Sequence, residues 1–156
     1  MVSNYINKKI ISICIPIRNE SKNIEPMYSQ LNEIFKNDLK EYEFEIIFTD
    51  NLSTDNSFQL VKKISVKDNR VKGYQFSKNV GKERSLLFGF QQAMGDAIIQ
   101  IDCDFEDPPE LIPDFVKKWE EGNEIVYGIR KKRNKDLYAF FRHSFYRIID
   151  LISDEK

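Results

Sequence analysis

Short apolar runs alternate with stretches of helical periodicity along the chain, and this alternation predicts an α/β fold with a mostly parallel sheet. Residues 10–15 are rich in isoleucine and predict a buried strand that Pro16 ends. Apolar positions then recur at three- and four-residue spacing over residues 24–35. This spacing predicts an amphipathic helix, with Ser21 or Asn23 as its N-terminal cap.

The rest of the chain continues the same alternation. Further strands are predicted at residues 44–48, 71–76, 97–101 and 125–127, and the run at 97–101 is apolar enough to be buried. Further helices are predicted at residues 54–68, 86–94 and 109–119. Gly95 is placed to cap the end of the third helix, and Leu111, Phe115 and Trp119 share one face of the fourth. These elements make one domain with no internal repeat.

Composition and charge limit the classes of function. With 156 residues, 41% hydrophobic and 31% charged, the chain suits one globular domain. Its 24 Lys and Arg nearly balance 25 Asp and Glu, which argues against nucleic acid as a partner. Cys14 and Cys103 lie in apolar runs and are expected to be reduced core thiols in a cytosolic environment. No run reaches the roughly 18 apolar residues of a membrane-spanning helix, so the chain is expected to be soluble or peripheral.

Polar clusters follow four of the five predicted strands. Open α/β sheets bind ligands at the carboxyl ends of their strands, which is where these clusters fall. They are residues 18–20, 50–51, 102–104 and 128–130. The sequence therefore predicts one site along this edge of the sheet.

The cluster at residues 102–104 is acidic and carries the clearest chemistry. Asp102 and Asp104 stand two residues apart, with Glu106 and Asp107 close behind, so their charges repel one another. A bound Mg²⁺ or Mn²⁺ would relieve this repulsion and could share its remaining positions with phosphates. The alternative is a solvated turn in which Asp107 starts the helix that follows. No His-rich or Cys-rich set suggests zinc, and no Gly-x-x-x-x-Gly-Lys-Ser/Thr loop suggests a P-loop enzyme.

Four segments, in this order, resemble a large family of inverting glycosyltransferases with the GT-A fold, a Rossmann-like nucleotide-binding architecture. They are residues 15–20, 50–57, 79–83 and 102–110. The most similar branch contains dolichyl-phosphate mannose synthases and bacterial polyprenyl-phosphate (bactoprenol) glucosyltransferases. The resemblance extends over about residues 8 to 152. It implies a nucleotide-sugar-binding GT-A domain at residues 8–130.

The resemblance also implies roles for individual residues. The residues implied to bind the nucleotide are Pro16, Arg18, Asn19, Glu20, Asp50, Lys82 and Asp102. Asp50 would contact the base, and Asp102 and Asp104 match the Asp-x-Asp pair that holds the ribose and the diphosphate-bound metal. Glu106 would assist the metal, and Arg130 would lie near the diphosphate. The catalytic set is then Asp102, Asp104 and Arg130. Simpler alternatives are a helix cap at Glu20, a turn residue at Asp50 and a solvated basic run at Arg130.

This sequence departs from the family pattern at three points. Asn51 stands where a second aspartate is usual, so a role that needs an anion there is in doubt. Glu106 replaces a glutamine and adds negative charge to the metal site. The family's acceptor-side segment would lie beyond Lys156, so the chain is expected to be truncated.

The implied reaction moves a hexose with inversion from a UDP- or GDP-sugar to a polyprenyl phosphate or a cell-surface glycan, with a divalent metal assisting. Residues 131–156 combine basic and aromatic side chains, which suits a helix at a membrane surface and, equally, a core or dimer-forming helix. The expected location is the cytoplasmic side of the membrane, and homo-oligomers are compatible with the pattern. The competing hypothesis is a catalytically incomplete chain that acts as a nucleotide-binding or interaction module.

Overall fold

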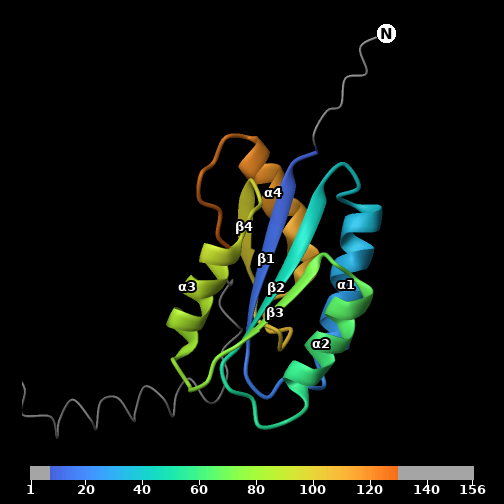
Figure 1. The fold of residues 1–156 in the computed structure, drawn as a ribbon. Coiled ribbons are helices and arrows are strands. Elements are labelled where there is room, and N and C mark those ends of the chain that lie inside the picture. The colour runs from blue at the N-terminus through green and yellow to red at the C-terminus, as the bar shows by residue number, and fades with distance from the viewer. Residues whose placement is uncertain (1–7, 130–156) are drawn as a thin grey trace, which may run out of the picture. The chain divides into compact units, whose positions relative to one another are not determined.

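A computed structural model describes residues 8–129 of the chain, and these contain a four-stranded parallel sheet in the order β3-β2-β1-β4 (Figure 1). The strands are β1 (Ile10–Ile17), β2 (Glu43–Asp50), β3 (Val71–Gln75) and β4 (Ala97–Gln100). The helices are α1 (Ile24–Asn37), α2 (Ser57–Lys67), α3 (Lys82–Gln92) and α4 (Ile112–Glu120), with a 3₁₀ turn η1 (Pro109–Leu111) before α4. The predicted α/β class and parallel sheet are confirmed. Arg130 and the predicted helical segment 131–156 lie outside the described residues.

The two faces of the sheet differ in what covers them. Ile11, Ile13 and Ile15 of β1 are fully buried and belong to one hydrophobic core with side chains of α1, α2 and α4. Alternate residues of a strand point to opposite faces, so Cys14 lies on the other side, where α3 packs and brings Gly89 close to it. Figure 1 shows α3 on one side of the sheet and α1 and α2 on the other. The strand ends that carry polar clusters are thereby packed on both faces, by this core on one and by α3 on the other.

Pro16 does not end the first strand, which continues to Ile17. The backbone carbonyl of Ile17 accepts a hydrogen bond from the N–H of Asn51, so Ile17 faces β2. Alternate residues of a central parallel strand bond to opposite neighbours, and Pro16 therefore faces β4. Pairing with β4 already ends where Cys14 lies opposite Gln100. No hydrogen bond of the sheet needs the N–H that proline lacks.

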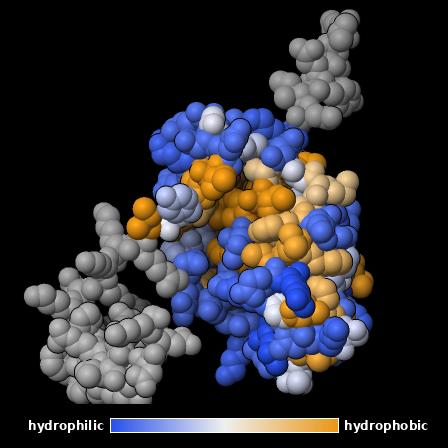
Figure 2. Space-filling view, turned by 90° about the vertical axis from the view of Figure 1, so that its left-hand side faces the viewer, coloured by the Kyte–Doolittle hydropathy of each residue, from blue (hydrophilic) through white to orange (hydrophobic). Residues whose placement is uncertain are grey.

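The fourth strand was expected to be buried, and this prediction is wrong. Within residues 8–129, β4 lies at the edge of the sheet, and Ile98 is 45% exposed. Figure 2 shows apolar side chains gathered on this side of the molecule among hydrophilic ones. Leu87 of α3 and Met94 of the following loop are also exposed. An apolar run indicates a strand here but does not reveal how many neighbours the strand has.

Residues 125–127 form no strand, which corrects the predicted fifth one. They belong to a second unit that begins at Glu124, and their large side chains are exposed, Ile125 by 83% and Tyr127 by 74%. Their β-branched and aromatic content favours a strand, but a strand also needs a partner for its backbone. No strand in the described ranges pairs with them.

Helix boundaries and faces differ from the predictions in detail. α2 begins at Ser57 rather than near residue 54, because Asp55 accepts the Ser57 N–H in the preceding turn. α3 begins at Lys82, four residues earlier than predicted. In α4 the buried residues are Ile112 and Val116, whereas the predicted face of Leu111, Phe115 and Trp119 is only partly covered.

Gly95 and the two cysteines pack closely against neighbouring parts of the fold. Gly95 is not the predicted helix cap, because α3 ends at Gln92. A Cβ at Gly95 would lie 2.7 Å from the carbonyl oxygen of Ile10, so glycine is needed for close approach to β1. Cys14 and Cys103 are buried free thiols, as predicted, and burial raises the pKa of each to about 12.

In the part of the chain that the structure covers, no helix is long and apolar enough to cross a bilayer.

Candidate functional site

A pocket of about 330 Å³ lies at the carboxyl ends of β1, β2 and β4, the edge at which the sequence predicts a site. Six predicted site residues line it, and they come from three of the four polar segments that carry the resemblance. They are Pro16, Arg18, Glu20, Lys82, Asp102 and Asp104. The other lining residues include Asn51, Asn79 and Cys103. The sheet thus gathers side chains that are up to 88 positions apart in the sequence (104 − 16).

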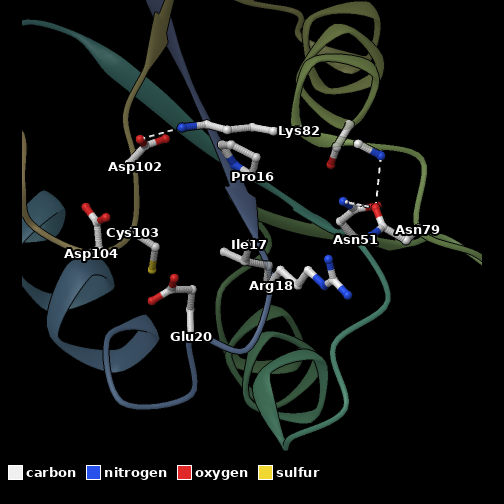
Figure 3. Close-up of a pocket in the computed structure, with 12 residues that line it drawn as sticks. Pro16, Ile17, Arg18, Glu20, Asn51, Asn79, Lys82, Asp102, Cys103 and Asp104 are labelled. Carbon is white, nitrogen blue, oxygen red and sulfur yellow. Dashed lines mark hydrogen bonds and ion pairs between the residues drawn. The ribbon is translucent and has the colours of Figure 1, made fainter. Parts of the chain in front are cut away.

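The acidic wall is formed by the loop that follows β4. Cys103 is 2% exposed and anchors this loop to the core, between Asp102 and the exposed Asp104. Asp104 accepts a hydrogen bond from the Glu106 N–H at 2.9 Å, and Phe105 between them has a φ of 62°. This turn holds both aspartates on the pocket side, with Glu20 on the same side in Figure 3.

Lys82 forms an ion pair with Asp102 across the pocket. Its Nζ lies 2.6 Å from Asp102 Oδ2, as the dashed line in Figure 3 shows. Lys82 is the first residue of α3, and Gly81 before it has a φ of 87°, which glycine adopts without strain. The hydrogen bond to Asp102 and the nearby charges of Asp102, Asp104 and Asp107 raise the pKa of Lys82. Lys82 is therefore cationic at neutral pH.

An amide pair on the opposite side of the pocket was not anticipated from the sequence. Asn51 donates from Nδ2 to Asn79 Oδ1 at 2.7 Å and accepts the Val80 N–H at 2.8 Å. Asn79 Oδ1 also accepts the Gly81 N–H at 3.0 Å. An aspartate at position 51 could not donate to Asn79, so the amide at this departure from the family pattern ties β2 to the loop before Lys82.

Two predicted nucleotide contacts, Asn19 and Asp50, do not line the pocket. The Asn19 side chain accepts the Thr54 N–H at 2.8 Å, and its φ is 59°. Asp50 is fully buried and accepts hydrogen bonds from Ser53 and from Gln75 Nε2 at 2.7 Å. Next to this turn, Leu52 has a φ of 60°. In this structure both predicted contacts brace the loops after β1 and β2.

Of the three predicted metal ligands, Asp102 and Asp104 line the pocket. Glu106 does not line the pocket, and among residues 8–129 no group of three or more His, Cys, Asp or Glu side chains is arranged to hold a metal ion. The pair Asp102 and Asp104 still fits Mg²⁺ or Mn²⁺, because these cations are commonly held by one or two carboxylates together with substrate phosphates. The two aspartates would thus supply part of the metal's ligands, and the phosphates of a bound ligand would supply others.

Charge is separated across the pocket. Figure 3 shows Asp102, Asp104 and Glu20 to one side of Ile17, and Arg18 with the amide pair to the other. Pro16 and Ile17 provide an apolar surface between them. Such an arrangement suits a ligand with one strongly anionic part that is held through a cation, and one flatter polar part that is held by hydrogen bonds.

The comparisons with known proteins agree with the motif order. The sequence model described as glycosyl transferase family 2 matches residues 12–155. An uncharacterized glycosyltransferase of Bacillus subtilis, YkcC, is 37% identical over 147 residues, which are 92% of this chain and 44% of that protein. A prophage bactoprenol glucosyl transferase homolog of Escherichia coli is 36% identical over 148 residues, 94% of this chain and 48% of that protein. The chain spans about half the length of these curated relatives.

A solved structure supports the fold. A mannosyltransferase of Pyrobaculum calidifontis, solved in complex with GDP-Man and Mn²⁺, aligns with a TM-score of 0.57 at 19% identity over 72% of this chain and 32% of the other. The predicted GT-A fold is thereby confirmed for the described residues. Since the family model matches most of the sequence, the chain belongs to glycosyl transferase family 2.

Proposed function

We propose that the pocket binds the nucleoside diphosphate of a UDP- or GDP-hexose, and that the protein transfers the hexose, with inversion, to a polyprenyl phosphate. The observation that carries this proposal is the pocket wall on which Asp102 and Asp104 stand beside the cationic Lys82. Carboxylates of this kind would hold Mg²⁺ or Mn²⁺ against a diphosphate. The fold neighbour that was solved with GDP-Man and Mn²⁺ is consistent with this choice of ligand.

The pocket residues would divide the work of donor binding. Asp102 and Asp104 would hold the cation, whose positive charge would offset the negative charge that develops on the leaving diphosphate. Lys82, beside the acidic wall, and Arg18, on the other side of Ile17, would add positive charge to the lining of the pocket. Pro16 and Ile17 would offer an apolar surface to the base and ribose, next to the amides of Asn51 and Asn79.

A lipid phosphate is the acceptor that demands least of these residues. Its oxygen is already ionised near neutral pH, because the second pKa of a phosphate monoester is about 6. This oxygen would attack the anomeric carbon from the side opposite the diphosphate, and the bond to the diphosphate oxygen would break. A sugar hydroxyl would instead need a carboxylate as a general base. The bactoprenol name of the Escherichia coli relative favours the lipid phosphate, and such an acceptor would bring the protein to the cytoplasmic face of the membrane.

Donor binding should depend on the metal. We expect UDP or GDP to raise the melting temperature in the presence of Mn²⁺ by several degrees more than in excess chelator, because ligand at 100 times its Kd adds about 2.7 kcal/mol to the free energy of unfolding. Differential scanning fluorimetry with both nucleotides, with and without chelator, measures this. Equal shifts in both conditions would remove the metal from the proposal.

Transfer should depend on the charge of the acceptor. With UDP-glucose or GDP-mannose as donor, we expect lipid-linked hexose to form from polyprenyl phosphate and not from the matching polyprenol, because only the phosphate offers an ionised oxygen. Thin-layer separation of radiolabelled lipid products measures this. Equal transfer to the alcohol would contradict the proposed acceptor. Metal-dependent nucleotide binding without any transfer would favour a nucleotide-binding module instead.

A further inference from the structure

The ion pair between Lys82 and Asp102 occupies a carboxylate oxygen that is also assigned to metal binding. Nζ of Lys82 lies 2.6 Å from Asp102 Oδ2, which is hydrogen-bonding distance, so the ammonium neutralises this carboxylate directly. Asp104 on the same wall has its Oδ1 engaged by the Glu106 N–H. The acidic wall is therefore partly neutralised by the protein's own cation.

We propose that Lys82 is an exchangeable counter-ion: it neutralises Asp102 before the donor binds, and it moves to the diphosphate when the divalent cation takes its place. The proposal rests on the proposed function and deepens it. It assigns Lys82 two successive partners, a carboxylate and then a phosphate oxygen. No covalent bond changes in this exchange. Asp102 has a cationic partner before and after it, first Lys82 and then the divalent cation.

The position of Lys82 permits such an exchange. Its side chain is 54% exposed and that of Asp102 is 28% exposed. Water therefore reaches the ion pair, and the two side chains hold each other only weakly. The Lys82 backbone is fixed at the start of α3, and the Asn51–Asn79 amide pair holds the loop before it. A fixed backbone with a long, exposed side chain lets the ammonium change partners while its base stays at the rim of the pocket.

The exchange predicts effects of opposite sign for one substitution. In Lys82→Met the competitor for Asp102 is lost, so Mn²⁺ alone should bind about three- to fivefold more tightly, as expected for removal of a surface ion pair. The same variant lacks a cation for the diphosphate, so UDP or GDP at saturating Mn²⁺ should bind about tenfold more weakly. A lysine that only stabilised the fold would not separate the two affinities in this way.

The test uses the 156-residue chain and two titrations. Electron paramagnetic resonance of free Mn²⁺ gives the affinity for Mn²⁺ alone, and calorimetry at fixed Mn²⁺ gives the affinity for UDP and GDP. Lys82→Arg keeps the charge and should resemble the parent in both. Lys78→Met is the matched control, because Lys78 lies exposed in the loop that precedes α3 and does not line the pocket. It should change either affinity less than twofold.

The outcomes separate this proposal from the proposed function. If the parent binds nucleotide with Mn²⁺ but Lys82→Met binds Mn²⁺ no better than the parent, the exchange is wrong and donor binding stands. If Lys78→Met reproduces both effects, general electrostatics explains them and the exchange is also wrong. If the parent binds neither Mn²⁺ nor nucleotide, both proposals fail together.

Discussion

Asp104→Asn should weaken Mn²⁺-dependent binding of UDP or GDP by tenfold or more, which is roughly 1.4 kcal/mol or above. The amide keeps the size of the side chain and its Oδ1 can still accept the Glu106 N–H, so the turn after β4 should persist. What is lost is the charge that makes a carboxylate a good ligand for a hard cation. Asp104 is exposed, so the melting temperature without ligand should stay close to that of the parent. Calorimetric titration with fixed Mn²⁺ measures the affinity.

Asp107→Asn provides the matched control for this prediction. Asp107 carries the same charge three residues later in the acidic segment, but it does not line the pocket. Its substitution should leave metal-dependent nucleotide binding within about twofold of the parent, since only a small screened charge effect remains. If Asp107→Asn abolishes binding and Asp104→Asn does not, the metal has been assigned to the wrong carboxylate.

Glu45→Ala should lower the free energy of unfolding by about 3 kcal/mol, the size expected when a buried charged network loses one partner. Oε1 of Glu45 accepts the Ser12 hydroxyl at 2.6 Å and the Met94 N–H at 2.7 Å, and Oε2 accepts Lys72 Nζ at 2.6 Å. The Glu45 side chain is 9% exposed, so water can replace these bonds only in part. The network fastens the loop between α3 and β4 to the sheet. Urea unfolding of the parent and the variant measures the difference.

The same carboxylate should make stability depend on pH. Burial acts to raise the pKa of Glu45, but hydrogen bonds from Lys72, Ser12 and Met94 outweigh it and the net pKa is lowered. A lowered pKa in the folded state means that this contribution is present above the unfolded pKa of about 4.3 and is lost as the pH falls below it. Glu45→Gln should lack this part of the acid sensitivity.

Glu41→Ala is the control for Glu45→Ala, because Glu41 is exposed. It should change the free energy of unfolding by less than about 0.5 kcal/mol, and an equal loss in Glu41→Ala and Glu45→Ala would contradict the network.

Strong local patterns predicted most of the fold. The isoleucine run of β1 and the spacing of Met27, Leu31 and Ile34 in α1 are dictated by burial, and the structure confirms them. The prediction failed where structure depends on distant neighbours. β4 and residues 125–127 have similar apolar composition, but one pairs with β1 and the other has no partner among the described strands.

The site shows the same division between local and distant information. The Asp102–Asp104 cluster is visible because its residues are close in sequence, and the structure places both in the pocket. The role of Asn51 was not visible, because it depends on Asn79, which lies 28 residues later. The sequence alone indicates that Asn51 keeps hydrogen-bonding ability and loses a negative charge, but it does not reveal its partners. Its geometry shows a donor and an acceptor used together, whereas a carboxylate at this position could only accept.

Asn19, Leu52 and Phe105 have left-handed backbone conformations, and these link the stability of the sheet to the shape of the pocket. Leu52 and Phe105 each cost roughly 1–2 kcal/mol in that conformation relative to the ordinary right-handed one, whereas asparagine adopts it more readily. Asn19 and Leu52 lie two residues after the ends of β1 and β2, and Phe105 lies in the loop after β4, so the cost is concentrated in the loops that shape the pocket. The sheet behind them must therefore be stable enough to impose these turns. A weakened sheet would let these loops relax before the core melts, so donor binding would fail at a temperature at which the domain is still folded.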